Sequence, residues 1–596
     1  MVSLLRSSLV AFVVWQLIRR IRRRSTSLAN IPGPRKEHWL KGNYHRIFQD
    51  GLKYNLDLAD TYGGAVRIHA VLGAEQLYIS DPLALQHIVI KEQDMYEETD
   101  MFILGNGLIF GQGLISTLGE QHRRQRKMLN PVFSITNMRT LSSLIQPIAD
   151  QLCMILLSQL QVDGSETEIN LLPWVSRSAL EYVCQGGLGH SFDALNPHNE
   201  SEYIHAIRML GTTTLRLLFL RPFIPFFVRN FSSYWRNKMV DWAPIQALKD
   251  LRRTVQVMDD ASREIFSAKK AALAEMHTDE EPISDTPAVK THGQDIMSIM
   301  LGANTSSFET DRLSDDELVG QMNTMIFAGL ETVTSAICRI LWILACKPSA
   351  QARLRSEIRD AKYASGHSSS WENVCLPYDI LNKLPYLDAV VKETLRLHPP
   401  TSLLSRTVRQ DTVLPLHRPI RSRSGEVLER IPIPKDTTLI ISILNANLDR
   451  DVWGEDAREW RPDRWLGIEA YGRDENEDVF DDNQNGEHGH SKMPGAKTEM
   501  RYPGVYANMM TFLGGGRACI GFKFAEMEIK QVIVTLLSRL HFSLPSVPDE
   551  HGQVKEIYWK ISALQVPVVH PPLGDGITPQ IPLGVRAVRD GDFELS

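Results

Sequence analysis

One cysteine lies in a glycine-rich loop just before a helix-like segment. Cys519 stands in the run Phe512-Leu-Gly-Gly-Gly-Arg-Ala-Cys-Ile-Gly521, and a helical pattern covers residues 522–540. Glycines on both sides of the cysteine allow the backbone to turn sharply and to come close to a flat ligand. Arg517 places a positive charge near the sulfur, which favours the thiolate, the form that binds metals. The loop is therefore a candidate metal site, and a structural cysteine in a glycine-rich turn is the alternative.

The spacing of five residues in this loop favours the metal site. Phe512, Gly515, Arg517, Cys519 and Gly521 fit the pattern Phe-x-x-Gly-x-Arg-x-Cys-x-Gly. This pattern resembles the heme-binding signature of the cytochrome P450 superfamily. The resemblance implies heme b, with Cys519 as the axial thiolate of the iron, Phe512 shielding the sulfur and Arg517 reaching a propionate.

Two polar residues interrupt a long apolar segment in the middle of the chain. Ser314 and the three acidic residues after it are typical of a helix start, and the apolar pattern continues to about Cys346. Lys347-Pro348 ends the pattern, so the expected helix has about thirty residues and can cross a whole domain. Glu331 and Thr332 lie inside this helix.

Five residues of this helix resemble a second motif of the same superfamily. Ala328-Gly-Leu-Glu-Thr332 fits the pattern Ala/Gly-Gly-x-Asp/Glu-Thr. The resemblance implies oxygen activation, in which the Thr332 hydroxyl would hydrogen-bond dioxygen and Glu331 would help to supply protons. The alternative is that the threonine only bonds the carbonyl oxygen four residues back. Val333 stands where the family often has threonine or serine, and we expect the chemistry to survive this departure.

Three charged residues match a supporting network of the family. Glu393 and Arg396 are three positions apart in a helical run, so they share a helix face and can pair. Two prolines follow that helix, and the segment Trp460-Arg-Pro-Asp-Arg464-Trp465 comes later. The resemblance implies that Arg464 joins Glu393 and Arg396 to brace the cysteine loop. Because a buried charge network must be fully satisfied, we expect loss of Glu393 or Arg396 to lose the heme.

Three further residues match positions that contact the heme propionates in the family. Arg126 fits the arginine of a Trp-x-x-x-Arg motif, and His122 replaces the tryptophan. The two are four residues apart and share a helix face. An imidazole can still donate a hydrogen bond, so His122 can keep the role, and a solvated basic face is the alternative. Arg406 corresponds to another propionate partner, and residues 401–404 would enter the pocket.

The elements expected around these residues are mainly helical, with small β-sheets. Residues 66–72 and 76–80 have the pattern of a β-hairpin. Residues 170–273 are largely helical in pattern, and residues 407–444 are rich in β-forming residues. Residues 101–117 are apolar and contain several glycines, which predicts a loop. The resemblance implies that this loop covers a hydrophobic substrate, and an ordinary buried loop is the alternative.

Size and composition exclude several other classes of protein. The chain has 596 residues, of which 43% are hydrophobic, so it can bury a large core. Its net charge of −6 gives no sign of nucleic-acid binding. The six cysteines include no Cys-x-x-Cys pair, which argues against a disulfide framework or a zinc site and fits a reducing compartment.

The N-terminal residues have the composition of a membrane segment. Residues 2–18 are mostly apolar, and the basic run Arg19-Arg-Ile-Arg-Arg-Arg24 follows. A signal peptide and an interfacial amphipathic helix are alternatives, since the apolar run is shorter than the roughly 20 residues of a spanning helix. A signal anchor fits best, because the basic run would stay in the cytosol and hold the following chain there. Ile31-Pro-Gly-Pro34 would then be a stiff hinge.

These patterns divide the chain into an anchor and one large domain. Residues 1–30 would form the membrane anchor and its basic stop, and residues 31–596 a heme domain with the cytochrome P450 fold that the resemblance implies. Residues 471–500 are acidic and almost free of apolar residues, which predicts a disordered surface insertion. The tail 571–596 contains many prolines and glycines, and we expect it to be irregular.

The resemblance implies a monooxygenase, which transfers one atom of dioxygen to a hydrophobic small molecule and the other to water. Electrons would come from a separate NADPH-dependent cytochrome reductase, with cytochrome b5 as a second donor, docking near Lys523 and Lys530. The enzyme would be a single-pass protein of the endoplasmic reticulum membrane, with its catalytic domain in the cytosol.

The substrate class is open to several interpretations. The chain resembles fungal members of the superfamily, which favours a terpenoid or another secondary metabolite. Fatty acids, sterols and xenobiotics are alternative substrates. A heme-thiolate isomerase or dehydratase is an alternative enzyme, against which the pair Glu331-Thr332 argues. A non-catalytic heme protein is the remaining alternative.

Overall fold

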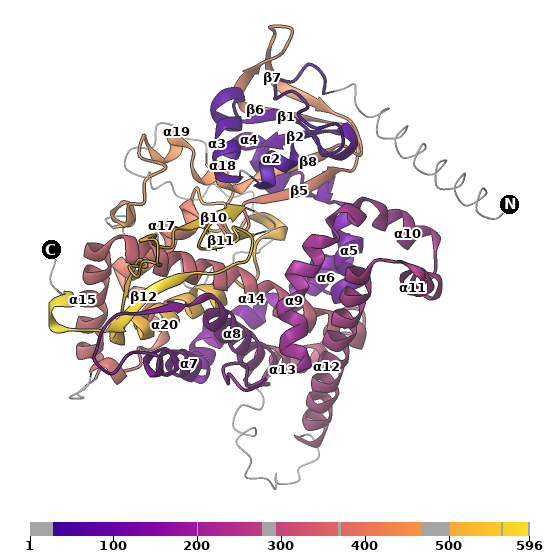
Figure 1. Ribbon diagram of the computed structural model, residues 1–596. Coiled ribbons are helices and arrows are strands. Elements are labelled where there is room, and N and C mark those ends of the chain that lie inside the picture. Colours follow the sequence, from indigo (N-terminus) through magenta and orange to yellow (C-terminus); the bar gives the residue numbers. More distant parts are fainter. Residues whose placement is uncertain are drawn as a thin grey trace.

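The computed structural model describes residues 28–49, 51–199, 201–276, 294–366, 371–466, 501–561 and 564–593. Within them the fold is mainly helical with four small β-sheets (Figure 1), as the sequence predicts. The predicted anchor lies almost wholly outside the described residues, and the acidic insertion 471–500 lies entirely outside them.

Helix α14 (Asp315–Cys346) forms the centre of the helical region. It begins with a capping box, in which Ser314 and Glu317 each accept the other's backbone N–H. Most of its side chains are buried, and it packs against α8 (Leu172–Tyr182) and α20 (Phe522–Arg539). The helix predicted from the capping residue to Cys346 is therefore confirmed.

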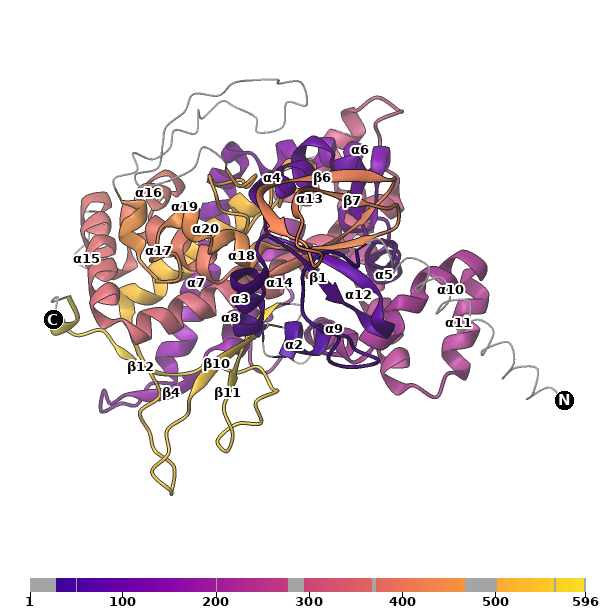
Figure 2. The same ribbon diagram turned by 90° about the horizontal axis from the view of Figure 1, so that it is seen from above.

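Among the residues that the structure describes, two helices could span a membrane by length and composition alone, namely α7 (Ile135–Ser158) and α14. Both have interior contacts, however, because α7 packs against α20 and α14 crosses the core. Figure 2 shows α14 between α15 (Pro348–Ser365) at one end of the molecule and α10 (Ile224–Asn230) and α11 (Ser233–Trp242) at the other. We therefore treat α7 and α14 as core helices.

The largest sheet supports the loops near the cysteine. Its strand order is β1-β2-β8-β5-β3, in which β1 and β2 form the predicted antiparallel hairpin and β2 pairs parallel to β8. The strands are β1 (Ala65–His69), β2 (Glu75–Ile79), β3 (Tyr96–Glu98), β5 (Leu403–Val408) and β8 (Thr438–Ser442).

The C-terminal tail is not irregular as predicted, because residues 582–587 form a strand. This strand, β12 (Pro582–Ala587), pairs with β4 (Thr167–Asn170) on one side and β9 (Leu540–Ser543) on the other. Leu583 and Val585 are fully buried. The partner strands are distant in the sequence, and strand formation here depends on pairing with them. The local proline and glycine content therefore could not predict this strand.

The apolar segment 101–117 is also not wholly a loop, because helix α5 (Asp100–Phe110) occupies most of it. Thr99 caps the helix by accepting the N–H of Phe102 at 3.2 Å. Phe110 packs on Phe327 of α14, with ring centroids 4.4 Å apart. Capping and packing thus outweigh the low helix propensity of the two glycines inside α5.

The remaining elements surround this core. The two-stranded sheets are β6 (Thr412–Arg421) with β7 (Val427–Ile433), and β10 (Ile557–Ile561) with β11 (Gln565–Val569). The other helices are α2 (Tyr44–Gln49), α3 (Gly51–Tyr62), α4 (Pro82–Gln86), α6 (Gly119–Leu129), α9 (Glu202–Arg216), α10 (Ile224–Asn230), α11 (Ser233–Trp242), α12 (Gln246–Met276), α13 (Ile296–Ser306), α16 (Tyr378–Lys383), α17 (Pro385–Leu397), α18 (Ile443–Asn447) and α19 (Arg450–Trp453).

Candidate active site

The cysteine loop is a closed turn at the start of α20. Cys519 follows a 3-10 turn over Gly515–Arg517, and its backbone N–H donates to the carbonyl oxygen of Phe512 at 2.7 Å. Gly515 has a φ of +63°, and a Cβ there would lie 2.2 Å from the carbonyl oxygen of Val89. Glycine is therefore required at this position by the turn itself. The ring of Phe512 packs against Phe522 with centroids 6.0 Å apart.

Cys519 is accessible to solvent, although protein atoms surround much of its sulfur. The residue is exposed by surface area, yet burial of the sulfur among protein atoms raises the pKa of its thiol. A backbone hydrogen bond from Gly521 and the charge of Arg126 oppose this rise. The sequence suggested Arg517 as the source of this charge, but its Nε pairs with Glu98 Oε2 at 3.1 Å. A thiol that is open on one side can bind a metal ion, and binding removes the proton.

Three arginines from separate elements surround the cysteine loop. Arg126 of α6 donates from Nη1 to the carbonyl oxygen of Ala518 at 2.7 Å, next to the cysteine. Arg517 of the loop and Arg406 of β5 both pair with Glu98 of β3, each at 3.1 Å. Arg126 and Arg406 are buried, and Arg517 is mostly so. Two guanidinium groups thus share the carboxylate of Glu98, and a third guanidinium lies beside the cysteine.

His122 belongs to α6, as Arg126 does, and it lies near Arg126 and Arg517. Its side chain is buried, and burial together with the charges of Arg517, Arg126 and Arg123 lowers its pKa to about 3. The imidazole is therefore neutral at physiological pH, with one nitrogen as donor and the other as acceptor. The structure thus brings together His122, Arg126, Arg406 and Arg517, the four residues predicted to contact the propionates.

The polar motif of α14 lies on a part of the helix that stays accessible. Ala328 is exposed although most of α14 is buried. The Thr332 hydroxyl donates to the carbonyl oxygen of Ala328 at 2.6 Å, the contact given above as the alternative to the oxygen role. A hydroxyl that donates can still accept, so the oxygen role of Thr332 stays a prediction.

Glu331 differs from a surface carboxylate in its surroundings. Its Oε1 would lie 2.5 Å from a Cβ on Gly211 of α9, so the carboxyl group packs closely against that helix. Burial raises the pKa of Glu331 above its usual value. A carboxyl group with a raised pKa holds a proton more readily near neutral pH and is suited to donating it.

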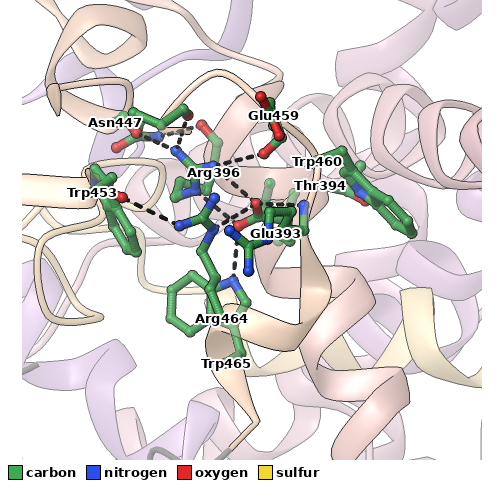
Figure 3. A network of polar contacts seen from close by, with 12 residues as sticks. Glu393, Thr394, Arg396, Asn447, Trp453, Glu459, Trp460, Arg464 and Trp465 are labelled. Carbon is green, nitrogen blue, oxygen red and sulfur yellow. Dashed lines mark hydrogen bonds and ion pairs between the residues drawn. The ribbon is translucent and has the colours of Figure 1, made fainter. Parts of the chain in front are cut away.

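Glu393, Arg396 and Arg464 meet in one buried network (Figure 3). Arg396 donates from Nε and Nη2 to the two carboxylate oxygens of Glu393, at 2.8 and 2.9 Å. Arg464 Nε donates to Glu393 Oε1 at 2.8 Å, and Trp465 Nε1 donates to Oε2 at 2.9 Å. The side chains of Glu393 and Arg396 have no accessible surface. The structure thus places the three predicted network residues in direct contact.

Asn447, which sequence reasoning did not identify, connects this network to the cysteine loop. Its Nδ2 donates to the carbonyl oxygen of Arg396 at 3.0 Å and to Thr511 Oγ1 at 2.8 Å. Its Oδ1 accepts the backbone N–H of Met510 at 2.6 Å. Thr511 in turn donates to the carbonyl oxygen of Leu395 at 2.8 Å. The residues just before Phe512 are therefore fixed to the end of α17.

Known proteins resemble this chain over almost its entire length. The family model described as Cytochrome P450 matches residues 32–568. Cytochrome P450 monooxygenase 219 of Postia placenta is 37% identical over 98% of both chains. Cytochrome P450 monooxygenase 81 of the same species is 39% identical over 96% of this chain and 94% of its own. This chain belongs to the cytochrome P450 family. A ganoderic acid synthetase of Ganoderma lucidum is also 33% identical over 97% of both chains.

The chain is accordingly a cytochrome P450 monooxygenase, an oxidoreductase whose family uses heme with a thiolate-bound iron. The residues described above fit such a group. Cys519 offers an accessible thiol, and the guanidinium groups of Arg126, Arg406 and Arg517 are suited to bind the negative charges of the heme propionates. The P450 family generally takes hydrophobic substrates and receives electrons from a reductase.

The structure corrects one part of the expected docking surface. Lys530 is buried, and its Nζ pairs with Asp388 at 2.8 Å and donates to Asn382 at 3.0 Å. It lies on an interior face of α20, so the prediction that it contacts a reductase is wrong. Arg123 and Lys127 of α6 are exposed, and each also pairs with a carboxylate, Arg123 with Asp94 at 2.8 Å and Lys127 with Asp311 at 3.0 Å.

Proposed function

We propose that this cytochrome P450 uses heme b bound through Cys519 to hydroxylate a terpenoid or a related hydrophobic secondary metabolite. The observation that carries the proposal is the accessible Cys519 thiol beside the guanidinium groups of Arg126, Arg406 and Arg517. The balanced reaction consumes dioxygen, two electrons and two protons, and it yields hydroxylated substrate and water.

Each predicted site residue has a role that its surroundings support. Arg126, Arg406, Arg517 and neutral His122 would bind the propionates, and Phe512 and Gly515 would shape the loop around the sulfur. When bound, the heme supplies the reductive activation of dioxygen. Glu331 would hold a proton, and the Thr332 hydroxyl would accept it while remaining hydrogen-bonded to its own helix.

The proposed substrate class rests on apolar surroundings and on one relative. Phe110 of α5 and Phe327 of α14 form an aromatic pair. Phe327 directly precedes the accessible Ala328. A large apolar substrate would be favoured there by burial of its surface. The name of the Ganoderma lucidum relative connects it with ganoderic acid, which supports a terpenoid.

The proposed cellular location depends on the N-terminal anchor and on the reductase that supplies electrons. Residues 1–30 would anchor the enzyme in the endoplasmic reticulum membrane, with residues 31–596 as the cytosolic heme domain. An NADPH–cytochrome reductase in the same membrane, with cytochrome b5 as a second donor, would dock on the outer face of α6 near Arg123 and Lys127.

The deciding experiment compares the wild-type protein with Cys519→Ala. We expect the dithionite-reduced, carbon monoxide-treated wild type to give a strongly red-shifted Soret band, and the variant to lose it. Product formation is then followed with reductase, NADPH and isotopically labelled dioxygen against a terpenoid, fatty-acid, sterol and xenobiotic panel. Label in the product supports the monooxygenase, whereas product formed without dioxygen or NADPH would indicate an isomerase or dehydratase. A histidine-type band would overturn the proposed ligand.

A further inference from the structure

One stripe of α14 continues from the proposed oxygen-activating residue to a buried polar cluster. Ala328, Thr332, Ser335 and Arg339 follow one another at intervals of four, three and four residues, so they lie along one face of the helix. Ser335 Oγ donates to the backbone carbonyl oxygen of Gln565 at 2.7 Å. Because three residues rise about 4.5 Å along a helix, Gln565 contacts α14 within one turn of Thr332.

Gln565, the first residue of β11, uses all of its polar groups to join three segments. Its Oε1 accepts from Arg339 Nη2 at 2.8 Å. Its Nε2 donates to the carbonyl oxygen of Pro399 and to Ser402 Oγ, both at 3.1 Å. Its backbone N–H donates to the carbonyl oxygen of Pro400 at 3.0 Å. The side chain is almost fully buried. α14, the segment after α17 and the β10–β11 hairpin thus meet at one residue.

Arg339 is a buried cation held by aromatic rings and an amide. Its guanidinium carbon lies 3.5 Å from the ring centroid of Trp559 on β10 and 5.4 Å from that of Trp342. Among the described residues, no carboxylate lies within ion-pair distance of it. Such stacking fixes the plane of the guanidinium, so its Nη2 is directed at Gln565 by packing rather than by an ion pair.

The segment that this cluster holds runs toward the cysteine loop. Ser402 immediately precedes β5, and Arg406 on the same strand reaches Glu98, which pairs with Arg517. β5 therefore begins beside the α14 stripe and continues to the proposed propionate site. Leu403 and Leu404, between these two points, are only partly buried.

We propose that Arg339 and Gln565 are positioning residues that set the width of the substrate site between α14, the start of β5 and the β10–β11 hairpin. The inference rests on the proposed function and adds two residues that touch neither the thiolate nor the proposed proton path. Their loss would change which ligands fit near the iron without removing the heme.

The test uses two probes that bind heme iron and differ in size, imidazole and 4-phenylimidazole. Full-length, heme-loaded wild type is compared with Arg339→Met, Gln565→Leu and the double variant by spectral titration. We expect the ratio of the two dissociation constants to change at least about fivefold in each variant, with the carbon monoxide band retained. The double variant should change the ratio no more than the larger single change, because the two residues act as one unit.

A matched control separates positioning from general loosening of the core. Arg355 of α15 is as deeply buried and donates to the carbonyl oxygens of Leu537 and Leu540, neither of which belongs to the α14 stripe or to the Gln565 cluster. We expect Arg355→Met to lower thermal stability and to leave the probe ratio unchanged.

Two outcomes would overturn the inference. An unchanged ratio in the heme-loaded variants, or an equal change in Arg355→Met, overturns it. If a single variant fails to fold, the double variant decides, since it leaves neither partner buried without the other. A wild type without the red-shifted carbon monoxide band overturns the proposed function instead, so the two failures are distinguishable.

Discussion

The side-chain oxygen of Asn447 accepts the backbone N–H of Met510 at 2.6 Å. The same side chain donates to the carbonyl oxygen of Arg396, so one amide joins the buried charge network to the chain just before the cysteine loop. The network lies at the end of α17, and Phe512, the residue after the two that Asn447 holds, accepts the backbone N–H of Cys519. We therefore expect changes in the network to affect cofactor retention more than the chemical step.

Replacement of Arg396 by alanine should abolish heme incorporation. The change removes one of the two arginine side chains that pair with the buried carboxylate of Glu393, and breaking a buried ion pair costs about 3–5 kcal/mol. The measurement is heme content per protein. Arg139→Ala is the control, because its ion pair with Asp379 is exposed and worth about 0–1 kcal/mol. Normal heme content in Arg396→Ala would contradict the bracing role.

Asn447→Ala should loosen the cysteine loop without removing any charge. It removes the contacts to Met510, Thr511 and Arg396, each worth about 1 kcal/mol, and leaves the N–H of Met510 buried without its acceptor. We expect lower thermal stability and a slow loss of the red-shifted carbon monoxide band during incubation. A band as durable as that of the wild type would show that the loop does not depend on this amide.

Thr332→Ala should uncouple NADPH consumption from product formation. Removing the hydroxyl interrupts the proposed proton path, so we expect product per NADPH to fall about tenfold or more while reduction continues. Thr334→Ala is a close control, since Thr334 also donates to the carbonyl oxygen four residues back, at 2.7 Å, but is buried. Equal losses in both variants would assign the effect to the helix rather than to the Thr332 hydroxyl.

Glu317→Gln should reduce the loss of unfolding free energy that occurs as the pH falls from 5 to 2. The pKa of Glu317 is lowered to about 2 by hydrogen bonds from Ser314, Gln121, Arg124 and Gln125, which outweigh its burial. A lowered carboxyl pKa stabilises the fold above the unfolded pKa near 4.5 and loses this effect as pH falls toward 2. At pH 7 we expect the variant to be less stable by about 3 kcal/mol. Equal slopes of unfolding free energy between pH 5 and 2 in both proteins would contradict this prediction.

Charge reversal on the outer face of α6 should slow electron transfer from the reductase. We expect Arg123→Glu combined with Lys127→Glu to lower the reduction rate about tenfold at low salt, with the carbon monoxide spectrum unchanged. Arg430→Glu is the control, because Arg430 is exposed on β7 at the far end of the β-rich region (Figure 1). Unchanged reduction in the α6 variant would place the docking surface elsewhere.

Local patterns in the sequence were enough to predict which residues the structure brings together at the candidate site. The spacing around Cys519 and the capping box and stop of α14 each lie within one continuous segment, so the sequence contains the whole signal. The three residues of the charge network could be predicted because they fit a motif.

Residues that act through distant contacts could not be found in this way. Glu98, Asn447 and Gln565 are ordinary polar residues in the sequence, and their importance comes from partners that only folding brings near. For the same reason Lys530 appeared to be a surface lysine, although α16 and α17 cover it. The strand β12 was hidden because its partners are far away in the chain.

The position of β12 between β4 and β9 also bears on the order of biosynthesis. The ribosome makes β4 and the whole helical core, including Cys519, before it makes residues 582–587. Until then, β4 and β9 each have an open edge that can pair with another nascent chain. Completion of this small sheet is therefore one of the latest events in synthesis, and a shortened message that stops before residue 582 would yield an aggregation-prone protein even with every catalytic residue in place.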